Sequence, residues 1–296
     1  MKTTTRILLA ASLLTATAMN APAQLAQPVK AAEFLGRDVN AVDHAKVGSL
    51  KDLAIDLENG RIVEAVIAQG GFLGIDTHFV VIPVQDLAFD AAGKTAQLNV
   101  SVEKLQAAPA VDFSRWNEAS TESSVENAYQ YYNLVPFFKV PEHQAHNPAN
   151  PTYLHLGQVE RASCLLGMET INHELQRIGK VRDLIVDFPQ GRVVEVIVDS
   201  GHYLGIPDEL SAVPPQALHY QPDRKDLMLV ATKSEITAAP HFSSRAWPVI
   251  DAVQATRVYQ AYHVLPYFLP IGGNTAAPSA SASDIKVKVA SSTAAN

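Results

Sequence analysis

Cysteine, basic runs and long apolar stretches are all scarce in this chain. Cys164 is the single cysteine among 296 residues, so no disulfide can form within the chain. Beyond the N-terminal start, no stretch is long and apolar enough to cross a bilayer as a helix. The formal charge is −7 and basic runs do not occur, which argues against nucleic acid and anionic membrane surfaces as partners. We therefore predict neither a nucleic-acid partner nor a membrane span.

The first residues have the pattern of a signal peptide. Lys2 and Arg6 provide a positive start, and the apolar run Ile7 to Ala18 that follows is too short to span a bilayer. The small residues Ala21 to Ala23 have the character of a cleavage site. We predict that residues 1–23 are removed and that the mature chain is exported, most simply to a bacterial periplasm.

The sequence contains an internal duplication with a period of 131 residues. Residues 47–75 align without a gap to residues 178–206. The matching positions are mainly glycines, turn residues and apolar residues, among them Gly36 and Gly167, Gly60 and Gly191, Pro83 and Pro214, and Trp116 and Trp247. The period is far above the roughly 20–50 residues of solenoid repeats, so we predict two tandem domains.

Each copy has the pattern of several short strands. Leu53 to Leu57 and Arg61 to Ile67 flank the dipeptide Asn59-Gly60, which favours a hairpin with a type I′ turn. In the second copy, Pro189 and Gly191 predict the same hairpin through different turn chemistry. About five or six short strands in about 80 residues predict a mainly β fold, with a small closed barrel in each copy.

A helical and aromatic extension follows each predicted barrel. Ser123 and Glu126 have capping-box spacing, and an apolar stripe at helical intervals runs from Val125 to Tyr132, before Pro136. Such aromatic stripes are more often core packing than an interaction face. The interaction candidates are Tyr129, Tyr132, Phe137, Phe138, Tyr259, Tyr262, Tyr267 and Phe268. We also predict that the extensions pack across between the barrels and join them into one pseudo-symmetric body.

The order of motifs resembles the PRC-barrel family. The first copy has Leu35-Gly36, Gly48-Ser49-Leu50-Lys51-Asp52-Leu53, Gly60-Arg61 and Pro83-Val84-Gln85-Asp86-Leu87, and the second has Leu166-Gly167, Gly179-Lys180-Val181-Arg182-Asp183-Leu184, Gly191-Arg192 and Pro214-Pro215-Gln216-Ala217-Leu218. The resemblance implies small β-barrels that act as docking and stabilising modules rather than as catalysts, as in the H subunit of photosynthetic reaction centres. The extension after each barrel falls outside the family pattern.

Six acidic side chains recur at matching positions of the two copies. They are Asp52, Asp56, Glu64, Asp183, Asp187 and Glu195. On a strand, Asp52 and Asp56 would lie on one face about 13 Å apart at about 3.3 Å per residue, too far apart to share a proton. The two glutamates are expected near Arg61 and Arg192 of the same hairpins. We interpret the six as turn-stabilising or surface-pairing groups and predict no catalytic residue.

Signals for a metal, a nucleophile or a phosphate are weak. His143, His146 and His155 form the one histidine cluster, but His-x-x-His in a proline-containing linker is a poor match to helical metal sites, which prefer i, i+4 spacing. Cys164 has no base placed near it by spacing, and we interpret it as a small half-buried side chain. The glycine-rich segment Gly70 to Gly74 lacks the Lys-Ser/Thr of a phosphate loop. We predict no metal and no cofactor.

The features together predict this order of segments: a signal peptide (1–23), an N-terminal lead (24–31), a first barrel (32–116) and its extension (117–138), a linker (139–161), a second barrel (162–247) and its extension (248–270), and a disordered tail (271–296). Within the tail, Ile285 to Val289 could form a strand on a partner. We expect an exported, non-enzymatic binding or scaffold protein that docks another envelope protein. Two alternatives stay open: a periplasmic protein that binds a small ligand or metal, and an unrecognised hydrolase.

Overall fold

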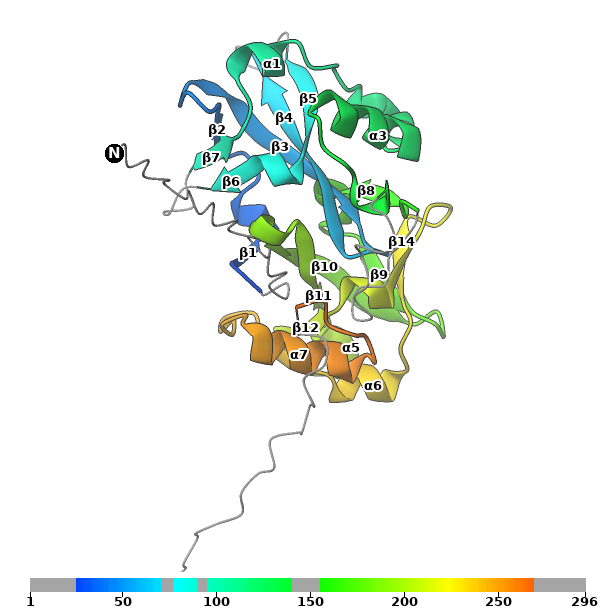
Figure 1. Ribbon diagram of the computed structural model, residues 1–296. Helices are drawn as coiled ribbons and strands as arrows, with labels where there is room; N and C mark the ends of the chain where they lie inside the picture. Colours follow the sequence, from blue (N-terminus) through cyan, green and yellow to red (C-terminus); the bar gives the residue numbers. More distant parts are fainter. Residues whose placement is uncertain (1–24, 71–76, 90–94, 140–154, 269–296) are drawn as a thin grey trace, which may run out of the picture.

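The computed structural model describes residues 25–70, 77–89, 95–139 and 155–268. The predictions for the signal peptide, for the tail and for most of the linker lie outside these residues. The described chain is mainly β, as predicted, and forms two stacked bodies (Figure 1). We call residues 25–139 the first repeat and residues 155–268 the second repeat. Within the described ranges, no helix has the length and apolar character needed to cross a membrane.

The two repeats contain the same six-stranded ladder. The first runs β6-β7-β2-β3-β4-β5 and consists of β2 (Asp38–Asn40), β3 (Lys46–Asp56), β4 (Arg61–Gln69), β5 (His78–Pro83), β6 (Leu87–Phe89) and β7 (Thr95–Leu98). The second runs β13-β14-β9-β10-β11-β12 and consists of β9 (Glu169–Asn172), β10 (Arg177–Asp187), β11 (Arg192–Asp199), β12 (Glu209–Val213), β13 (Leu218–Gln221) and β14 (Asp226–Leu229). The duplication predicted from the sequence is therefore a duplication of structure.

Short helices connect and cover these strands. The α-helices are α1 (Val102–Gln106), α2 (Trp116–Ala119), α3 (Glu122–Tyr131), α4 (Ala162–Leu165), α5 (Gly201–Leu204), α6 (Lys233–Ala238) and α7 (Ala252–Ala261). Turns of 3₁₀ helix are η1 (Ala31–Glu33), η2 (Val84–Asp86), η3 (Phe113–Arg115), η4 (Phe137–Lys139), η6 (Phe188–Gln190) and η7 (Pro215–Ala217). Because η2 joins β5 to β6 and η7 joins β12 to β13, each ladder stays open between its two edge strands. The expected closed hydrogen-bonded barrel is wrong in that respect.

The hairpin between β3 and β4 depends on a glycine, but not through a type I′ turn. Gly60 has φ 59°, and no other residue of the turn has a positive φ. Its N–H donates to the carbonyl of Leu57 at 3.1 Å, just as the N–H of Gly191 donates to Phe188 at 3.0 Å. Both turns are a short helical turn closed by one left-handed glycine, which is a common longer hairpin connection. The type I′ prediction for Asn59 was therefore wrong, because that turn requires a positive φ at both central residues.

The two repeats exchange a strand. β1 (Pro28–Lys30) precedes the first ladder but pairs with β10 of the second repeat, whereas β8 (Val159–Arg161) precedes the second ladder but pairs with β3 of the first (Figure 1). The registers match, since Pro28 lies opposite Asp187 and Val159 lies opposite Asp56. The predicted lead and linker therefore each end in a strand that completes the other body.

The repeated aspartates hold the exchanged segments. Asp56 accepts a hydrogen bond from the backbone N–H of Gly157 at 2.9 Å, and its counterpart Asp187 accepts one from Ala26 at 2.7 Å. Asp52 likewise accepts from the N–H of Ser163 at 3.0 Å. The counterpart Asp183 accepts from Ala32 at 3.2 Å. All four carboxyls are buried, so the expected surface pairing was wrong. The expected turn-stabilising role is confirmed for Asp56, which accepts from the backbone N–H of Asn59 at 3.0 Å, and the four carboxyls also stabilise the joint between the repeats.

A third joint lies where the two hairpins meet. Arg61 of β4 and Arg192 of β11 are paired residues, and the N–H of Ile62 donates to the carbonyl of Gly191 at 3.0 Å. In the reciprocal bond, the N–H of Val193 donates to Gly60 at 3.1 Å. The bonds make the two ladders one continuous sheet, with the repeats related by a pseudo-two-fold axis at this point.

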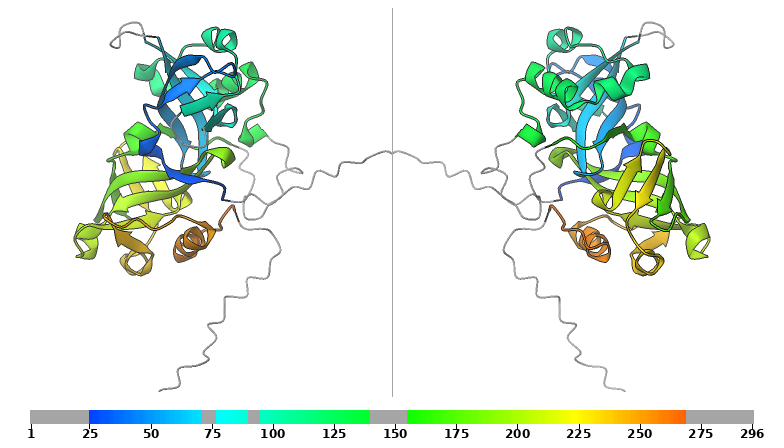
Figure 2. Two further views of the ribbon diagram at one scale, coloured as in Figure 1. Left: turned by 90° about the vertical axis from the view of Figure 1, so that its left-hand side faces the viewer. Right: turned by 90° about the vertical axis from the view of Figure 1, so that its right-hand side faces the viewer.

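The helical extensions pack on their own repeats rather than between them. α3 contacts β5 and α7 contacts β12, and Figure 2 places these helices on separate bodies. Tyr129 donates its hydroxyl proton to the carbonyl of Val63 at 2.6 Å, and Tyr259 donates to Val194 at 3.0 Å. The prediction that the extensions join the barrels is wrong for the helices, because the exchanged strands and paired hairpins do so.

Only the aromatic ends of the extensions reach the joint. The guanidinium of Arg61 lies 5.0 Å from the ring centre of Phe137, and that of Arg192 lies 4.6 Å from the ring centre of Tyr267. The start of α3 also differs from the prediction, because the cap is Thr121, whose side chain accepts from the N–H of Ser124, and not Ser123. Each extension is thus anchored at its helix by a tyrosine and at its end by an arginine.

Candidate functional site

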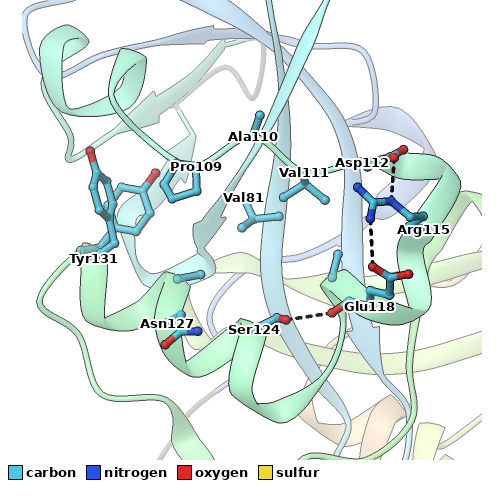
Figure 3. Close-up of a pocket in the computed structure, with 13 residues that line it drawn as sticks. Val81, Pro109, Ala110, Val111, Asp112, Arg115, Glu118, Ser124, Asn127 and Tyr131 are labelled. Atoms are coloured by element: carbon cyan, nitrogen blue, oxygen red, sulfur yellow. Dashed lines mark hydrogen bonds and ion pairs between the residues drawn. The ribbon is translucent and has the colours of Figure 1, made fainter.

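An open groove of about 380 Å³ lies on the first repeat between β5 and α3 (Figure 3). Its apolar surface comes from Val81 of β5, from the segment Pro109 to Val111 and from Ala128 of α3. Charged side chains of the α2 region line one end, and Tyr131 lines the other. An apolar floor with polar groups at its margin is the usual composition of a binding pocket.

The floor is fixed by backbone pairing to the edge strand. Ala110 forms an isolated bridge with Val80, and the N–H of Val111 donates to the carbonyl of Phe79 at 2.7 Å. Pro109 precedes this segment and cannot continue α1, because proline lacks the N–H that a helix needs. The chain therefore lies extended along β5 at this point, and Val111 lines the groove.

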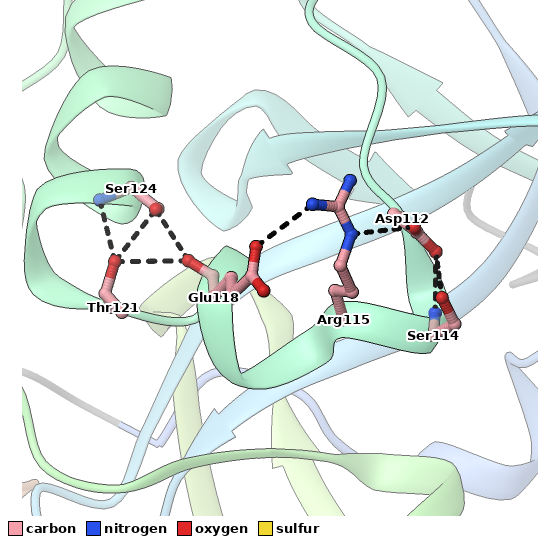
Figure 4. A network of polar contacts seen from close by, with 6 residues as sticks. All are labelled: Asp112, Ser114, Arg115, Glu118, Thr121 and Ser124. Atoms are coloured by element: carbon pink, nitrogen blue, oxygen red, sulfur yellow. Dashed lines mark hydrogen bonds and ion pairs between the residues drawn. The ribbon is translucent and has the colours of Figure 1, made fainter.

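Three charged residues form a network at one end of the groove (Figure 4). The carboxylate of Asp112 accepts hydrogen bonds from the Ser114 hydroxyl at 2.6 Å and from Nε of Arg115 at 3.0 Å. Nη1 of Arg115 also donates to Glu118 at 3.2 Å. The bonds from Ser114 and Arg115 lower the pKa of Asp112 to about 2. The rim therefore brings the side chains of Asp112 and Glu118 together around the guanidinium of Arg115, with Asp112 ionised near neutral pH.

The wall beside this network is held by hydroxyl groups. Thr121 donates to the Ser124 hydroxyl at 2.8 Å, and Ser124 in turn donates to the carbonyl of Glu118 at 2.8 Å (Figure 4). These bonds tie the end of α2 to the beginning of α3. They set the angle between the two helices and with it the shape of the groove.

The opposite end of the groove is closed by a pair of tyrosines. The rings of Tyr131 and Tyr132 are 4.9 Å apart and nearly perpendicular, a favourable edge-to-face arrangement. The Tyr131 hydroxyl donates to the carbonyl of Lys104 at 2.6 Å, which ties α3 to α1. Tyr131 is half-buried, so its ring offers an apolar surface to the groove.

The second repeat differs at the same place. There, β15 (His241–Ser243) pairs with β12 along three residues, where the first repeat has one bridge. Phe242 stands at the position of Val111, and its ring packs 5.2 Å from that of Trp247. A larger side chain therefore stands in the second repeat at the position that Val111 has beside the groove. Ala261 replaces Tyr131, whereas Tyr262 is the counterpart of Tyr132, so one of the two tyrosine rings at this end of the groove is specific to the first repeat.

Two glutamates are buried at matching positions beneath α3 and α7. Burial raises the pKa of Glu64 to about 8 and that of Glu195 to about 8. Oε1 of Glu64 has no hydrogen-bond partner among the described residues. Burial, and next the nearby Glu64, also raises the pKa of the Tyr129 hydroxyl. The predicted surface pairing with Arg61 was wrong, and both carboxyls hold their protons at neutral pH, enclosed away from the groove.

The aromatic residues selected from the sequence are mostly core residues. Seven of them are buried, namely Tyr129, Tyr132, Phe138, Tyr259, Tyr262, Tyr267 and Phe268, and Phe137 is half-buried. The stripe thus packs inward, which was the more common of the two expected roles. The sequence reasoning missed the groove itself, although Asp112, Arg115 and Glu118 have the i, i+3 spacing of paired charges.

Two candidate residues for metal binding and nucleophilic chemistry, His155 and Cys164, do not line the groove. His155 is exposed, and its Nε2 lies 3.2 Å from Glu58. His143 and His146 lie outside the described residues, and no group of three potential metal ligands occurs within them. Burial raises the pKa of the Cys164 thiol, which disfavours the thiolate that a nucleophile needs.

Comparison with known proteins connects this architecture to a family. The model of the PRC-barrel domain matches residues 29–105 and 157–236, which together make up just over half of the chain. The first match begins within β1 and the second just before β8, so both include the exchanged strands. No curated protein matches the chain. The chain belongs to the PRC-barrel family, with one family domain in each repeat.

Proposed function

We propose that this protein is a non-enzymatic docking protein, and that the groove between β5 and α3 receives an apolar side chain of a protein partner. The observation that carries the proposal is the difference between the repeats. The first repeat has a groove beside its edge strand, whereas the second has the larger Phe242 and the longer pairing of β15 at the corresponding place. A duplicated frame needs no such difference for its own stability, so the hollow is available for binding.

The chemistry of the groove suits an apolar anchor with a basic neighbour. Its volume falls in the range of about 300–1,000 Å³ that binding pockets occupy. In protein interfaces, buried apolar anchors fill such pockets and a polar rim surrounds them. Asp112 and Glu118 share one guanidinium, Arg115, so the rim has an excess negative charge. A lysine or arginine beside the anchor would balance it.

Binding accounts for these side chains better than catalysis does. The rim charges are paired with one another, and Asp112 stays ionised well below neutral pH, so it is a poor proton donor or acceptor there. The Tyr131 hydroxyl already donates to a backbone carbonyl. Glu64, whose raised pKa would suit acid or base chemistry, is enclosed beneath α3.

We also propose that the protein acts after export, in the cell envelope. Support comes from the positive start at Lys2 and Arg6, the apolar run and the small residues at Ala21 to Ala23. Mass spectrometry of the protein from its native host should find a chain that starts near Gln24. An intact N-terminus on cytoplasmic protein would refute export while leaving the docking proposal standing.

Site-specific photo-crosslinking tests the docking proposal with a built-in control. A photoreactive phenylalanine analogue is placed at position 127 of α3, beside the groove, or at the matching position 257 of α7. In intact cells, position 127 should give a discrete cross-linked protein, and position 257 should not. Val111→Phe should fill the groove and reduce that product at least tenfold. Equal products from both positions, or a product unaffected by Val111→Phe, would contradict the proposal.

A further inference from the structure

A second groove, of about 730 Å³, lies at the junction of the two repeats. Its floor is a cluster of three phenylalanines. The ring of Phe34 lies 4.4 Å from that of Phe89 and 5.4 Å from that of Phe188, and Phe89 and Phe188 are 4.5 Å apart. Phe188 comes from the second repeat and the other two from the first. The groove therefore exists only because the repeats are joined.

Two strand edges border this groove. Pro28 and Val29 of β1 line one side, and the residues of β6, Leu87 to Phe89, line the other. In the described part of the chain, β1 pairs only with β10, and β6 only with β7. Each strand therefore presents its second backbone edge without a strand partner. Such edges accept an additional strand, whose alternate side chains then point to one face.

The pseudo-symmetric position on the other side of the joint has a different chemistry. A hollow of about 430 Å³ lies there, lined by Glu160 of β8, Cys164 and Tyr220 of β13. In this hollow, Tyr220 stands at the position that Phe89 has in the groove between β1 and β6. Cys164 and Lys225 add polar groups. The apolar floor is therefore a property of the groove between β1 and β6 and not a by-product of the duplication.

We propose that this groove binds the chain's own segment Ile285 to Val289 as an added β-strand. The segment reads Ile-Lys-Val-Lys-Val, so as a strand it has one face of three β-branched apolar residues and one face of two lysines. The apolar face matches the phenylalanine floor, and the lysines face solvent. The backbone of the segment pairs with β1, β6 or both.

The position of the chain end makes this docking possible within one molecule. The described chain ends at Phe268, directly after Tyr267, whose ring lies 4.6 Å from the guanidinium of Arg192 at the joint. Arg192 follows η6, and η6 supplies Phe188 and Pro189 to the groove. Sixteen residues separate Phe268 from Ile285, enough to span about 50 Å when extended, roughly the width of a domain of this size.

The docked segment would cover the groove from within the same molecule and would also link the two ladders. It would cover an apolar groove and two sheet edges. When such surfaces are exposed, they promote unwanted association with other chains. The inference is independent of the docking groove beside α3, because the two grooves share no lining residue. A result that contradicts one of the two binding proposals therefore leaves the other proposal standing.

Hydrogen exchange on the full chain tests the proposal. The backbone amides of residues 285–289 should exchange at least tenfold more slowly than those of the neighbouring residues 276–282. Val287→Asp should remove this protection, because it puts a charge on the apolar face, whereas the control Lys288→Ser should keep it. Ala88→Asp, at an exposed position of β6, should also remove it without changing the melting midpoint.

A peptide supplied in trans provides the second readout. A labelled peptide of residues 284–290 should bind the full-length Val287→Asp variant at least tenfold more tightly than the wild-type chain, whose groove is already occupied. Unprotected amides in the wild type would overturn the proposal. Equal binding to both proteins would also overturn it, since the groove would then be open to a partner's strand. So would failure of the peptide to bind the variant.

Discussion

The two repeats have the same frame and different surfaces. Both have the six-stranded ladder, the left-handed glycine turn, the buried aspartates and the buried glutamate, at positions 131 residues apart. They differ beside the edge strand, where the first repeat has an open groove and the second has Phe242. They differ again at the joint, where Phe89 has Tyr220 as its counterpart. The shared features are those that the fold requires, and the features that differ are the ones to which we assign the proposed binding.

The two repeats are not only similar in structure but also complete each other. Each ladder gains a strand that belongs, by chain order, to the other repeat, and a buried aspartate of one repeat binds the backbone of the other. Neither repeat is complete alone. The central claim is therefore that the two repeats form one folding unit.

Removing an aspartate at the joint should have the largest effect on stability. Asp56→Ala leaves the N–H of Gly157 and the side-chain amide of Asn59 without their acceptor in a buried place. We expect a loss of about 3 kcal/mol in the free energy of unfolding, measured by urea denaturation. The exposed Asp38, paired with Lys46, is the control, and Asp38→Ala should cost under about 0.5 kcal/mol. Equal losses for both would show that the joint adds nothing.

The buried glutamates should make stability fall as the pH rises. In the unfolded chain they ionise near the ordinary pKa of 4.5, whereas folded Glu64 and Glu195 keep their protons up to about pH 8. Their contribution is thus fully present below about pH 4.5 and is lost progressively towards pH 8. Glu64→Gln should raise stability at pH 8 by about 2 kcal/mol, and by much less at pH 4.5, since one pKa unit corresponds to about 1.4 kcal/mol. Glu195→Gln should have the same effect on stability at each pH. A variant with the wild-type pH dependence would show that Glu64 is ionised in the folded protein.

Exchanging the side chains at the matching positions 111 and 242 should change the stability of the protein to different extents. Phe242→Val removes a half-buried ring that packs on Trp247 and should cost about 1 kcal/mol. Val111→Phe adds a ring to an open hollow and should change stability by less than about 0.5 kcal/mol. Thermal unfolding of both variants checks this. A Val111→Phe variant as strongly destabilised as Phe242→Val would mean that the groove is too closed to receive a side chain.

The smallest effect is expected at the groove rim. Arg115→Ala breaks exposed ion pairs to Asp112 and Glu118, which contribute little to stability, so the melting midpoint should stay close to that of the wild type. It should nevertheless raise the pKa of Asp112 from about 2 towards its usual value, because a hydrogen bond and a positive charge are lost. Titration followed by NMR measures this directly. If the pKa of Asp112 does not move, Arg115 is not its partner in solution.

Much of the frame could be predicted from the sequence because it depends on local rules. One recurring pair of glycines marks a position where a side chain does not fit: a Cβ on Gly48 would lie 2.1 Å from the carbonyl oxygen of Ala68, and one on Gly179 would lie 1.7 Å from that of Asp199. The helical stripe of α3 was visible through its 3.6-residue spacing. The match to the PRC-barrel family confirmed the resemblance carried by the same motifs.

The strand exchange was not predicted, because a strand of three residues gives no local sign of its partner. In the structure, β1 and β8 begin 131 residues apart, so the duplication extends into the lead and the linker, although the two strands share no residue in sequence. Burial of Glu64 and Glu195 was missed for a related reason. The helices that cover them follow far along the chain, and a charged residue in a strand more often faces solvent.

Cleavage between the repeats tests the central claim most directly. A specific protease site placed within residues 140–154 allows the purified chain to be cut after folding. Because each half contributes a strand to the other, the two fragments should stay together in a 1:1 complex on gel filtration and unfold in a single transition close to that of the uncut chain. Two separately eluting fragments, each with its own melting midpoint, would contradict the account.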